Sequence, residues 1–381
     1  MDNIYAYTDQ NKFFPEVKKN FGFGCMRLPM NDSEVDFDAF SEMVDYFLDN
    51  GFNYFDTAHG YLRGKSETAL RECLVKRHKR EEYILVNKLS ENYFKTNEDL
   101  MPLFDSQLEA CGVDYFDFYL MHSQNSGNYQ QYKRCKAYEF AFDLKKAGKV
   151  RHVGLSFHDK ADFLDMILTE HPDIEVVQIQ FNYLDYYDAQ VESKKCYEVC
   201  VKHNKPVIVM EPVKGGSLVN LPALAQAEFD KLSNGSNASY AIRFAASFDN
   251  IAMVLSGMSN MEQMADNVGF MKEFKPINDK EMAAIDNVRS IITSEHLIPC
   301  TACEYCVAGC PKNIAIPNLF ADYNNKKRDD GWISSFYYNV HTTGHGKASD
   351  CIKCGKCEKI CPQHLKIRDL LVDVAELFEN K

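Results

Sequence analysis

Long apolar runs are missing from this chain of 381 residues. No stretch reaches the roughly 18 consecutive apolar residues that suggest a membrane span. The opening segment, Met1 to Phe14, contains Asp2 and Asp9 and lacks the apolar run of a signal peptide. A basic patch of the kind that binds nucleic acid is also absent, and the formal net charge is −12. We therefore expect a cytoplasmic protein with no membrane span and no nucleic-acid partner.

Cysteine, in contrast, is abundant: the chain has 14, and eight of them form two short runs near the C-terminus. Each run reads C-x2-C-x2-C-x3-C-P, which is the spacing of bacterial ferredoxin motifs. Disulfides among cysteines this close would be strained, and structural zinc normally takes two separated C-x2-C knuckles. The runs therefore predict two 4Fe-4S clusters bound by Cys300, Cys303, Cys306, Cys310, Cys351, Cys354, Cys357 and Cys361.

The last cysteine of each run is expected to bind the other run's cluster, as in two-cluster ferredoxins. A first cluster would then be held by Cys300, Cys303, Cys306 and Cys361. A second cluster would be held by Cys351, Cys354, Cys357 and Cys310. Scattered cysteines are most often small buried hydrophobes, and we expect a structural role for the other six: Cys25, Cys73, Cys111, Cys135, Cys196 and Cys200.

Short apolar runs alternate with amphipathic helical stretches along roughly the first 270 residues. Eight runs are strand candidates: Phe21 to Leu28, Asn53 to Thr57, Tyr83 to Leu89, Phe116 to Met121, Val150 to Ser156, Val176 to Phe181, Pro206 to Met210 and Ile251 to Ser256. This alternation implies a parallel sheet of the α/β class, and eight strands can close a (β/α)8 TIM barrel. A doubly wound open sheet is the competing fold, although no full G-x-G-x-x-G fingerprint follows Gly22 and Gly24.

Four polar residues come at or just after the ends of adjacent predicted strands: Asp56, Tyr61, Lys88 and His122. Each alone has a common structural explanation, such as a helix cap or a surface lysine, but the carboxyl ends of barrel strands are where active sites form. A tyrosine needs a nearby cation to lower its pKa for proton transfer near neutrality. We expect Lys88 to supply that field, Asp56 to hold Lys88, and His122 to donate to a carbonyl oxygen.

These segments resemble those of the aldo-keto reductase family. The stretch from Phe55 to Tyr61 is similar to the family's F-D-T-A-x-x-Y segment, and Val86-Asn87-Lys88 and Leu120-Met121-His122 match the segments that bear its lysine and histidine. The resemblance covers about Phe21 to Asn267. It implies a TIM barrel that reduces a carbonyl, or oxidises an alcohol, with a nicotinamide cofactor.

The same resemblance implies positions for that cofactor. Ser156 and Gln178 would bind the carboxamide, and Met210 stands where many members have an aromatic residue against the nicotinamide ring. Gly257, Gln263 and Asn267 belong to the segment that meets the adenosine phosphate. This segment lacks the usual Lys or Arg, which leaves the choice between NADP and NAD open. The loop from Val213 to Leu221 is either a phosphate-binding loop or an ordinary flexible connection.

Residues 1–290 are expected to form the barrel and residues 291–381 a smaller, mainly helical iron–sulfur domain. The second part resembles the α-helical ferredoxin modules of other redox enzymes. Its aromatic residues, Trp332, Phe336, Tyr337 and Tyr338, are expected to pack in the core of this domain or against the barrel.

Nicotinamide transfers two electrons whereas each cluster transfers one, and no flavin signature is visible. Three functions stay open at this point. The barrel reduces a carbonyl while the clusters exchange electrons with a redox partner protein. Alternatively, the clusters are structural or sense oxidants and the barrel works alone, or the protein is an electron carrier whose barrel no longer uses nicotinamide.

Overall fold

The computed structural model describes residues 12–189, 191–232, 235–294, 297–328 and 332–379. These residues form two compact units. The first contains the described chain up to Pro212 together with Ala238–Ile277. The second contains Val213–Asn237 and the described chain from Asn278 onward, so the connection after the seventh barrel strand belongs to the second unit.

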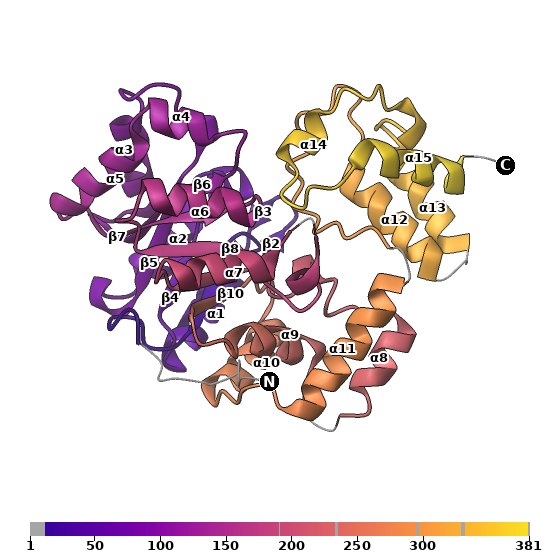
Figure 1. The fold of residues 1–381 in the computed structure, drawn as a ribbon, viewed down its shortest axis with the longest axis horizontal. Coiled ribbons are helices and arrows are strands. Elements are labelled where there is room, and N and C mark those ends of the chain that lie inside the picture. The colour runs from indigo at the N-terminus through magenta and orange to yellow at the C-terminus, as the bar shows by residue number, and fades with distance from the viewer. Residues whose placement is uncertain (1–11, 190, 233–234, 295–296, 329–331, 380–381) are drawn as a thin grey trace. The chain divides into compact units, whose positions relative to one another are not determined.

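Eight parallel strands close the first unit into a barrel (Figure 1). Their order around the barrel is β1 (Phe21–Gly24), β10 (Ile251–Ser256), β9 (Val207–Met210), β8 (Val176–Gln180), β7 (Val150–Phe157), β6 (Phe116–Gln124), β5 (Ile84–Leu89) and β4 (Tyr54–Asp56). The predicted barrel is therefore confirmed, and the open doubly wound sheet is wrong. A separate antiparallel hairpin joins β2 (Met30–Asn31) to β3 (Glu34–Val35).

Helices connect the barrel strands, as the amphipathic stretches of the sequence predict. They are α1 (Phe37–Asp49), α2 (Lys65–Leu70), α3 (Leu100–Cys111), α4 (Tyr129–Arg134), α5 (Ala137–Lys146), α6 (Ala161–Glu170), α7 (Ser193–Lys202), α9 (Asn237–Ala246) and α10 (Met261–Lys272). Asp36 begins α1 as its cap, accepting a hydrogen bond from the Ala39 amide at 3.0 Å. Within the described part of the chain, no helix combines the length and the apolar character needed to cross a membrane.

Apolar side chains fill the barrel interior, where Tyr54, Phe118, Leu120 and Val176 belong to one buried cluster. Gly154 of β7 makes this packing possible, because a Cβ there would lie 2.6 Å from both Leu120 and Val176 side-chain carbons. The barrel is thus a packed core that supports the chemistry placed at its strand ends.

The second unit is helical. It contains α8 (Ala223–Phe229), α11 (Asp279–Ser294), α12 (Ile316–Arg328), α13 (Trp332–Thr342), α14 (Lys356–Ile360) and α15 (Ile367–Phe378). Tyr338 is buried and stacks on Phe378 with ring centroids 4.4 Å apart. Phe336 and Tyr337 are about half exposed, so the predicted place in this domain's core is wrong for these two residues. The Trp332 side chain lies outside the described part.

Candidate functional site

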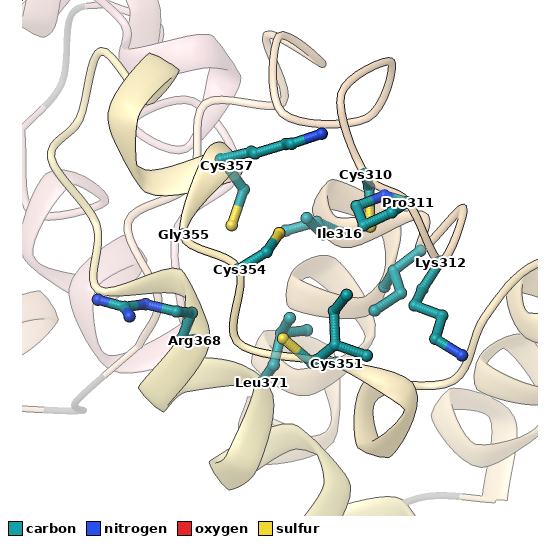
Figure 2. Close-up of a pocket in the computed structure, with 13 residues that line it drawn as sticks. Cys310, Pro311, Lys312, Ile316, Cys351, Cys354, Gly355, Cys357, Arg368 and Leu371 are labelled. Carbon is teal, nitrogen blue, oxygen red and sulfur yellow. The ribbon is translucent and has the colours of Figure 1, made fainter.

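Four cysteines line a cavity in the second unit (Figure 2). The volume is about 340 Å3, its open mouth included, and apolar side chains of Ile314, Ile316 and Leu371 form part of the wall. The thiols come from both runs: Cys310, Cys351, Cys354 and Cys357. Four thiols around an apolar cavity fit the donor set of a 4Fe-4S cluster, and Cys310 lies with the second run, as the exchange of fourth ligands requires.

The other set of cysteines gathers around Cys306, which is buried. Burial raises the pKa of the Cys306 thiol, and the neighbouring Cys303, Cys300, Cys361 and Cys357 raise it further. Burial likewise raises the pKa of Cys357 to about 11. Because iron binds thiolates, loading these sites must release protons.

The four polar residues predicted for proton transfer come together at the carboxyl ends of neighbouring strands. Asp56 is the last residue of β4, and Lys88 and His122 lie near the ends of β5 and β6. Tyr61 opens a short 3-10 turn, Tyr61–Gly64, in the connection that follows β4. Barrel closure and strand register thus place side chains from three connections at one mouth.

Lys88 is the centre of this group, and its side chain is fully buried. Its ammonium donates to the Asp56 carboxylate at 2.6 Å and to the Thr57 carbonyl at 2.8 Å. The same ammonium lies 3.4 Å from the Tyr61 hydroxyl and 4.8 Å from the centre of its ring. The structure thus places Asp56 in contact with Lys88, as its predicted role requires.

Burial dominates the electrostatics of the ion pair. It raises the pKa of Asp56 and lowers the pKa of Lys88, while their mutual attraction opposes both shifts. A buried pair of this kind is costly to break, because the partner left behind is an uncompensated charge.

Tyr61 departs from the expectation that Lys88 lowers its pKa. Burial raises the pKa of the phenol well above its ordinary value, and the negative charges of Asp56, Cys25 and Glu211 raise it further. Sequence reasoning counted the cation and missed the loss of solvent around the hydroxyl. Tyr61 therefore stays protonated at neutral pH, which is the state of a proton donor.

His122 is neutral for a related reason. Burial lowers the pKa of its imidazole well below the ordinary value, and Lys88 and His158 lower it further. Its Nδ1 lies 2.5 Å from the Ser90 hydroxyl, and its ring is 5.9 Å from that of Tyr61. When Ser90 donates to Nδ1, the proton of the neutral ring is on Nε2, where it can be donated to a substrate oxygen.

A barrel with these four residues at one mouth was compared with known proteins. The sequence pattern described as "Aldo/keto reductase family" matches residues 20–290. The chain belongs to the aldo/keto reductase family. A second pattern, "4Fe-4S dicluster domain", matches residues 299–365.

Curated relatives of this aldo/keto reductase match only part of it. 4-Dihydromethyl-trisporate dehydrogenase of Mucor mucedo is 28% identical over 188 residues, which is 42% of this chain and 55% of the relative. NAD(P)H-dependent D-xylose reductase of Scheffersomyces stipitis is 25% identical over 40% of this chain and 55% of its own. The chain thus spans about half the length of these relatives.

Solved structures share its barrel. The holo form of an aldo-keto reductase from Bacillus halodurans has a TM-score of 0.56 and 23% identity, covering 71% of this chain and 91% of that one. An aldo-keto reductase of Klebsiella pneumoniae in complex with NADPH has a TM-score of 0.58 and 17% identity over 71% and 90%. At these identities the likeness concerns the fold.

The residues that the family resemblance links to nicotinamide lie on the strands that come next around the barrel, after the strands of Asp56, Lys88 and His122. Ser156 of β7 and Gln178 of β8 are both buried. The Ser156 hydroxyl accepts from the Ser123 amide at 2.7 Å, and the Gln178 amide reaches Asp56 at 3.5 Å. Met210 ends β9 and is only partly buried. Ser156 thus contacts the residue that follows His122, and Gln178 contacts Asp56 itself.

The segment after β10 is organised by its own polar side chains. Gln263 accepts from the Ser259 amide at 2.8 Å, and Asn267 donates to the Ser256 hydroxyl at 2.9 Å. Arg27, from the connection after β1, runs alongside: a Cβ on Gly257 would lie 3.4 Å from the Arg27 Cβ. The sequence predicted no cation in this segment, and the fold brings one from another part of the chain.

A buried polar network holds the backbone of Lys88 in this aldo/keto reductase. Asn87 accepts from the Lys88 amide at 2.8 Å, and Gln107 of α3 donates to the Lys88 carbonyl at 2.9 Å. The buried Glu67 carboxylate in turn accepts from Asn87 at 2.8 Å. Nothing in the sequence pointed to Gln107, because a polar residue in an amphipathic helix is ordinarily exposed.

Proposed function

We propose that this aldo/keto reductase reduces a small-molecule carbonyl with a nicotinamide cofactor and that Tyr61 delivers the proton. The observation that carries the proposal is the Lys88 ammonium, which contacts both Asp56 and the Tyr61 hydroxyl. The partly buried, protonated phenol of Tyr61 is a donor, and the neutral His122 is a second one. Together they form a site for a carbonyl oxygen that gains negative charge.

The roles of the residues follow from their charges. When bound, the nicotinamide supplies a hydride to the carbonyl carbon. His122 orients the carbonyl oxygen, and Tyr61 protonates that oxygen as it becomes an alkoxide. The Lys88 ammonium stabilises the phenolate that remains, and Asp56 keeps the ammonium beside it. The reverse sequence oxidises an alcohol, with the phenolate of Tyr61 as the base.

We place the cofactor along the arc of Ser156, Gln178, Met210, Gly257 and the helix that carries Gln263 and Asn267. Ser156 and Gln178 are proposed to bind the carboxamide. Arg27 is proposed to bind the phosphate that distinguishes NADPH from NADH, because a guanidinium pairs well with a phosphate dianion. The NADPH complex of the Klebsiella structure supports this placement by analogy. We therefore propose NADP as the preferred cofactor.

For the second unit we propose two 4Fe-4S clusters that exchange single electrons with a redox partner. The cysteine cavity and the match to a dicluster domain support this assignment. Anaerobically purified protein is expected to contain about eight irons and eight sulfides per chain, and two reduced-cluster signals in electron paramagnetic resonance. Four irons and one signal would reduce the assignment to a single cluster.

The proton-donor role is tested by Tyr61→Phe, which removes only the hydroxyl. The expected fall in kcat/KM for NADPH-dependent aldehyde reduction is about 10²- to 10⁴-fold, with the cluster spectra unchanged. Tyr46→Phe on the outer helix α1 is the matched control and should retain the wild-type rate. An active Tyr61→Phe protein would rule out Tyr61 as the donor.

A further inference from the structure

Lys214 is a buried lysine that the proposed reaction does not use. It opens a short turn, Lys214–Gly216, in the connection after β9, and only 2% of its surface is exposed. Among its contacts, its ammonium donates to the side-chain oxygen of Gln363 at 3.0 Å. Gln363 is buried as well. Both residues belong to the second unit, so this contact lies within one compact body.

Gly215 brings the same turn onto the first cysteine run. A Cβ at Gly215 would lie 2.5 Å from the Thr301 carbonyl oxygen and 2.9 Å from its Cα. The backbone of Gly215 has φ +63°, in the region that favours glycine. The turn therefore packs backbone against backbone here, which fixes the position of the neighbouring Lys214.

The two contact points belong to two cysteines of the same predicted cluster. Thr301 directly follows Cys300, and Gln363 comes two residues after Cys361. Gln363 thus ties the ammonium to the segment that carries Cys361, and Gly215 ties the turn to the segment that carries Cys300. The second cavity is different, because its lining cations, Lys312, Lys356 and Arg368, are all exposed to water, and Arg368 is paired with Glu358.

We propose that Lys214 raises the reduction potential of the cluster held by Cys300, Cys303, Cys306 and Cys361. The proposal rests on the proposed function in one respect, since it requires the clusters. A thiolate-bound cluster is anionic and gains one negative charge when it accepts one electron. A buried cation stabilises the reduced form more than the oxidised form, because low-dielectric surroundings screen it poorly. Exposed lysines act much less, since water and salt screen them.

The consequence is an asymmetry between the clusters. The first cluster, beside Lys214, is the better electron acceptor, and the second, whose Cys354 is exposed, exchanges electrons at the surface. An electron that enters at the second cluster comes to rest on the first. One electron moves between the clusters, and no proton is required.

The test is an anaerobic potentiometric titration of the whole protein, followed by electron paramagnetic resonance. Lys214→Met is expected to shift one of the two couples to a more negative potential and to leave the other in place. Lys214→Arg should restore the wild-type value. Cys354→Ser perturbs the second cluster and so identifies which couple belongs to it. Lys312→Met is the matched control at an exposed lysine, and both couples should stay in place.

Lys214→Gln keeps a donor for Gln363 without the charge, and it should show the same shift if the methionine variant loads iron poorly. The proposal is overturned if any neutral variant with full iron content leaves both couples unshifted. It is also overturned if the couple that moves is the one identified by Cys354→Ser. Failure of the proposed clusters would look different, because wild-type protein would then lack two cluster signals.

Discussion

The two units hold their reactive side chains in opposite ways. In the barrel, the reactive groups already satisfy one another: the Lys88 ammonium binds Asp56, Thr57 and Tyr61. In the second unit, four thiols surround a cavity. The first site is organised by the chain itself, whereas the second is completed by iron. The barrel should therefore depend on its ion pair, and the cluster unit on metal.

Breaking the ion pair should have the largest effect. Lys88→Met leaves the Asp56 carboxylate buried without its cation, and the free energy of unfolding of the barrel should fall by about 3–5 kcal/mol. Carbonyl reduction should be lost as well. Denaturant unfolding followed by barrel-specific hydrogen exchange measures the first effect.

The double variant Lys88→Met, Asp56→Leu separates stability from catalysis. It removes both charges, so most of the stability should return while activity stays absent. If Lys88→Met alone unfolds like wild type, the pair does not organise the barrel site.

Removing iron should affect the other unit. Cys354→Ala combined with Cys357→Ala should abolish the second cluster and loosen the helices around it, as seen in iron content and hydrogen exchange of α14 and α15. NADPH-dependent aldehyde reduction should stay within roughly twofold of wild type, because the barrel has its own core. Loss of reduction in a protein with an intact barrel would show that the units cannot be separated in this way.

A smaller effect is expected at Arg27. Arg27→Ala should raise the KM for NADPH by about tenfold or more, the value of a charged hydrogen bond, and change the KM for NADH little. Arg134→Ala, exposed on α4, is the control. If Arg27→Ala raised the KM for NADPH and for NADH equally, Arg27 would contact a part of the cofactor that both molecules share.

The pH dependence should show almost no change near neutrality. Reduction needs the protonated phenol, and the raised pKa of Tyr61 keeps it protonated up to and beyond the ordinary tyrosine value of about 10. The rate of reduction should therefore stay level through neutral pH and fall only in strong alkali, while alcohol oxidation should increase with pH. A fall in the rate of reduction near pH 7 would mean that Lys88 lowers the pKa of Tyr61 more than burial raises it.

The barrel and its four mouth residues were predictable because both follow local rules. Strand and helix patterns repeat along the chain, and Asp56, Lys88 and His122 stand at strand ends. The iron–sulfur assignment followed from the spacing of the cysteines alone. In each case the signal lies within a few neighbouring residues.

Features that depend on long-range closure were not predictable. Arg27 reaches the segment after β10 because β1 and β10 are neighbours in the closed barrel, and its carbonyl accepts from Ser259, 232 residues away. The pKa of Tyr61 depends on how much water the whole mouth excludes. Gln363, which accepts a hydrogen bond from Lys214, lies 149 residues further along the chain.

The most direct test of the account is the fate of the hydride. Protein is incubated anaerobically with NADPH carrying deuterium at the transferable position and with an aromatic aldehyde, and the alcohol is analysed by mass spectrometry. The account predicts deuterium on the carbinol carbon of product made by wild type and by the Cys354→Ala, Cys357→Ala protein, and formation of that product about 10²- to 10⁴-fold more slowly with Tyr61→Phe. Unlabelled alcohol from wild type, or labelled alcohol at the wild-type rate from Tyr61→Phe, would contradict it.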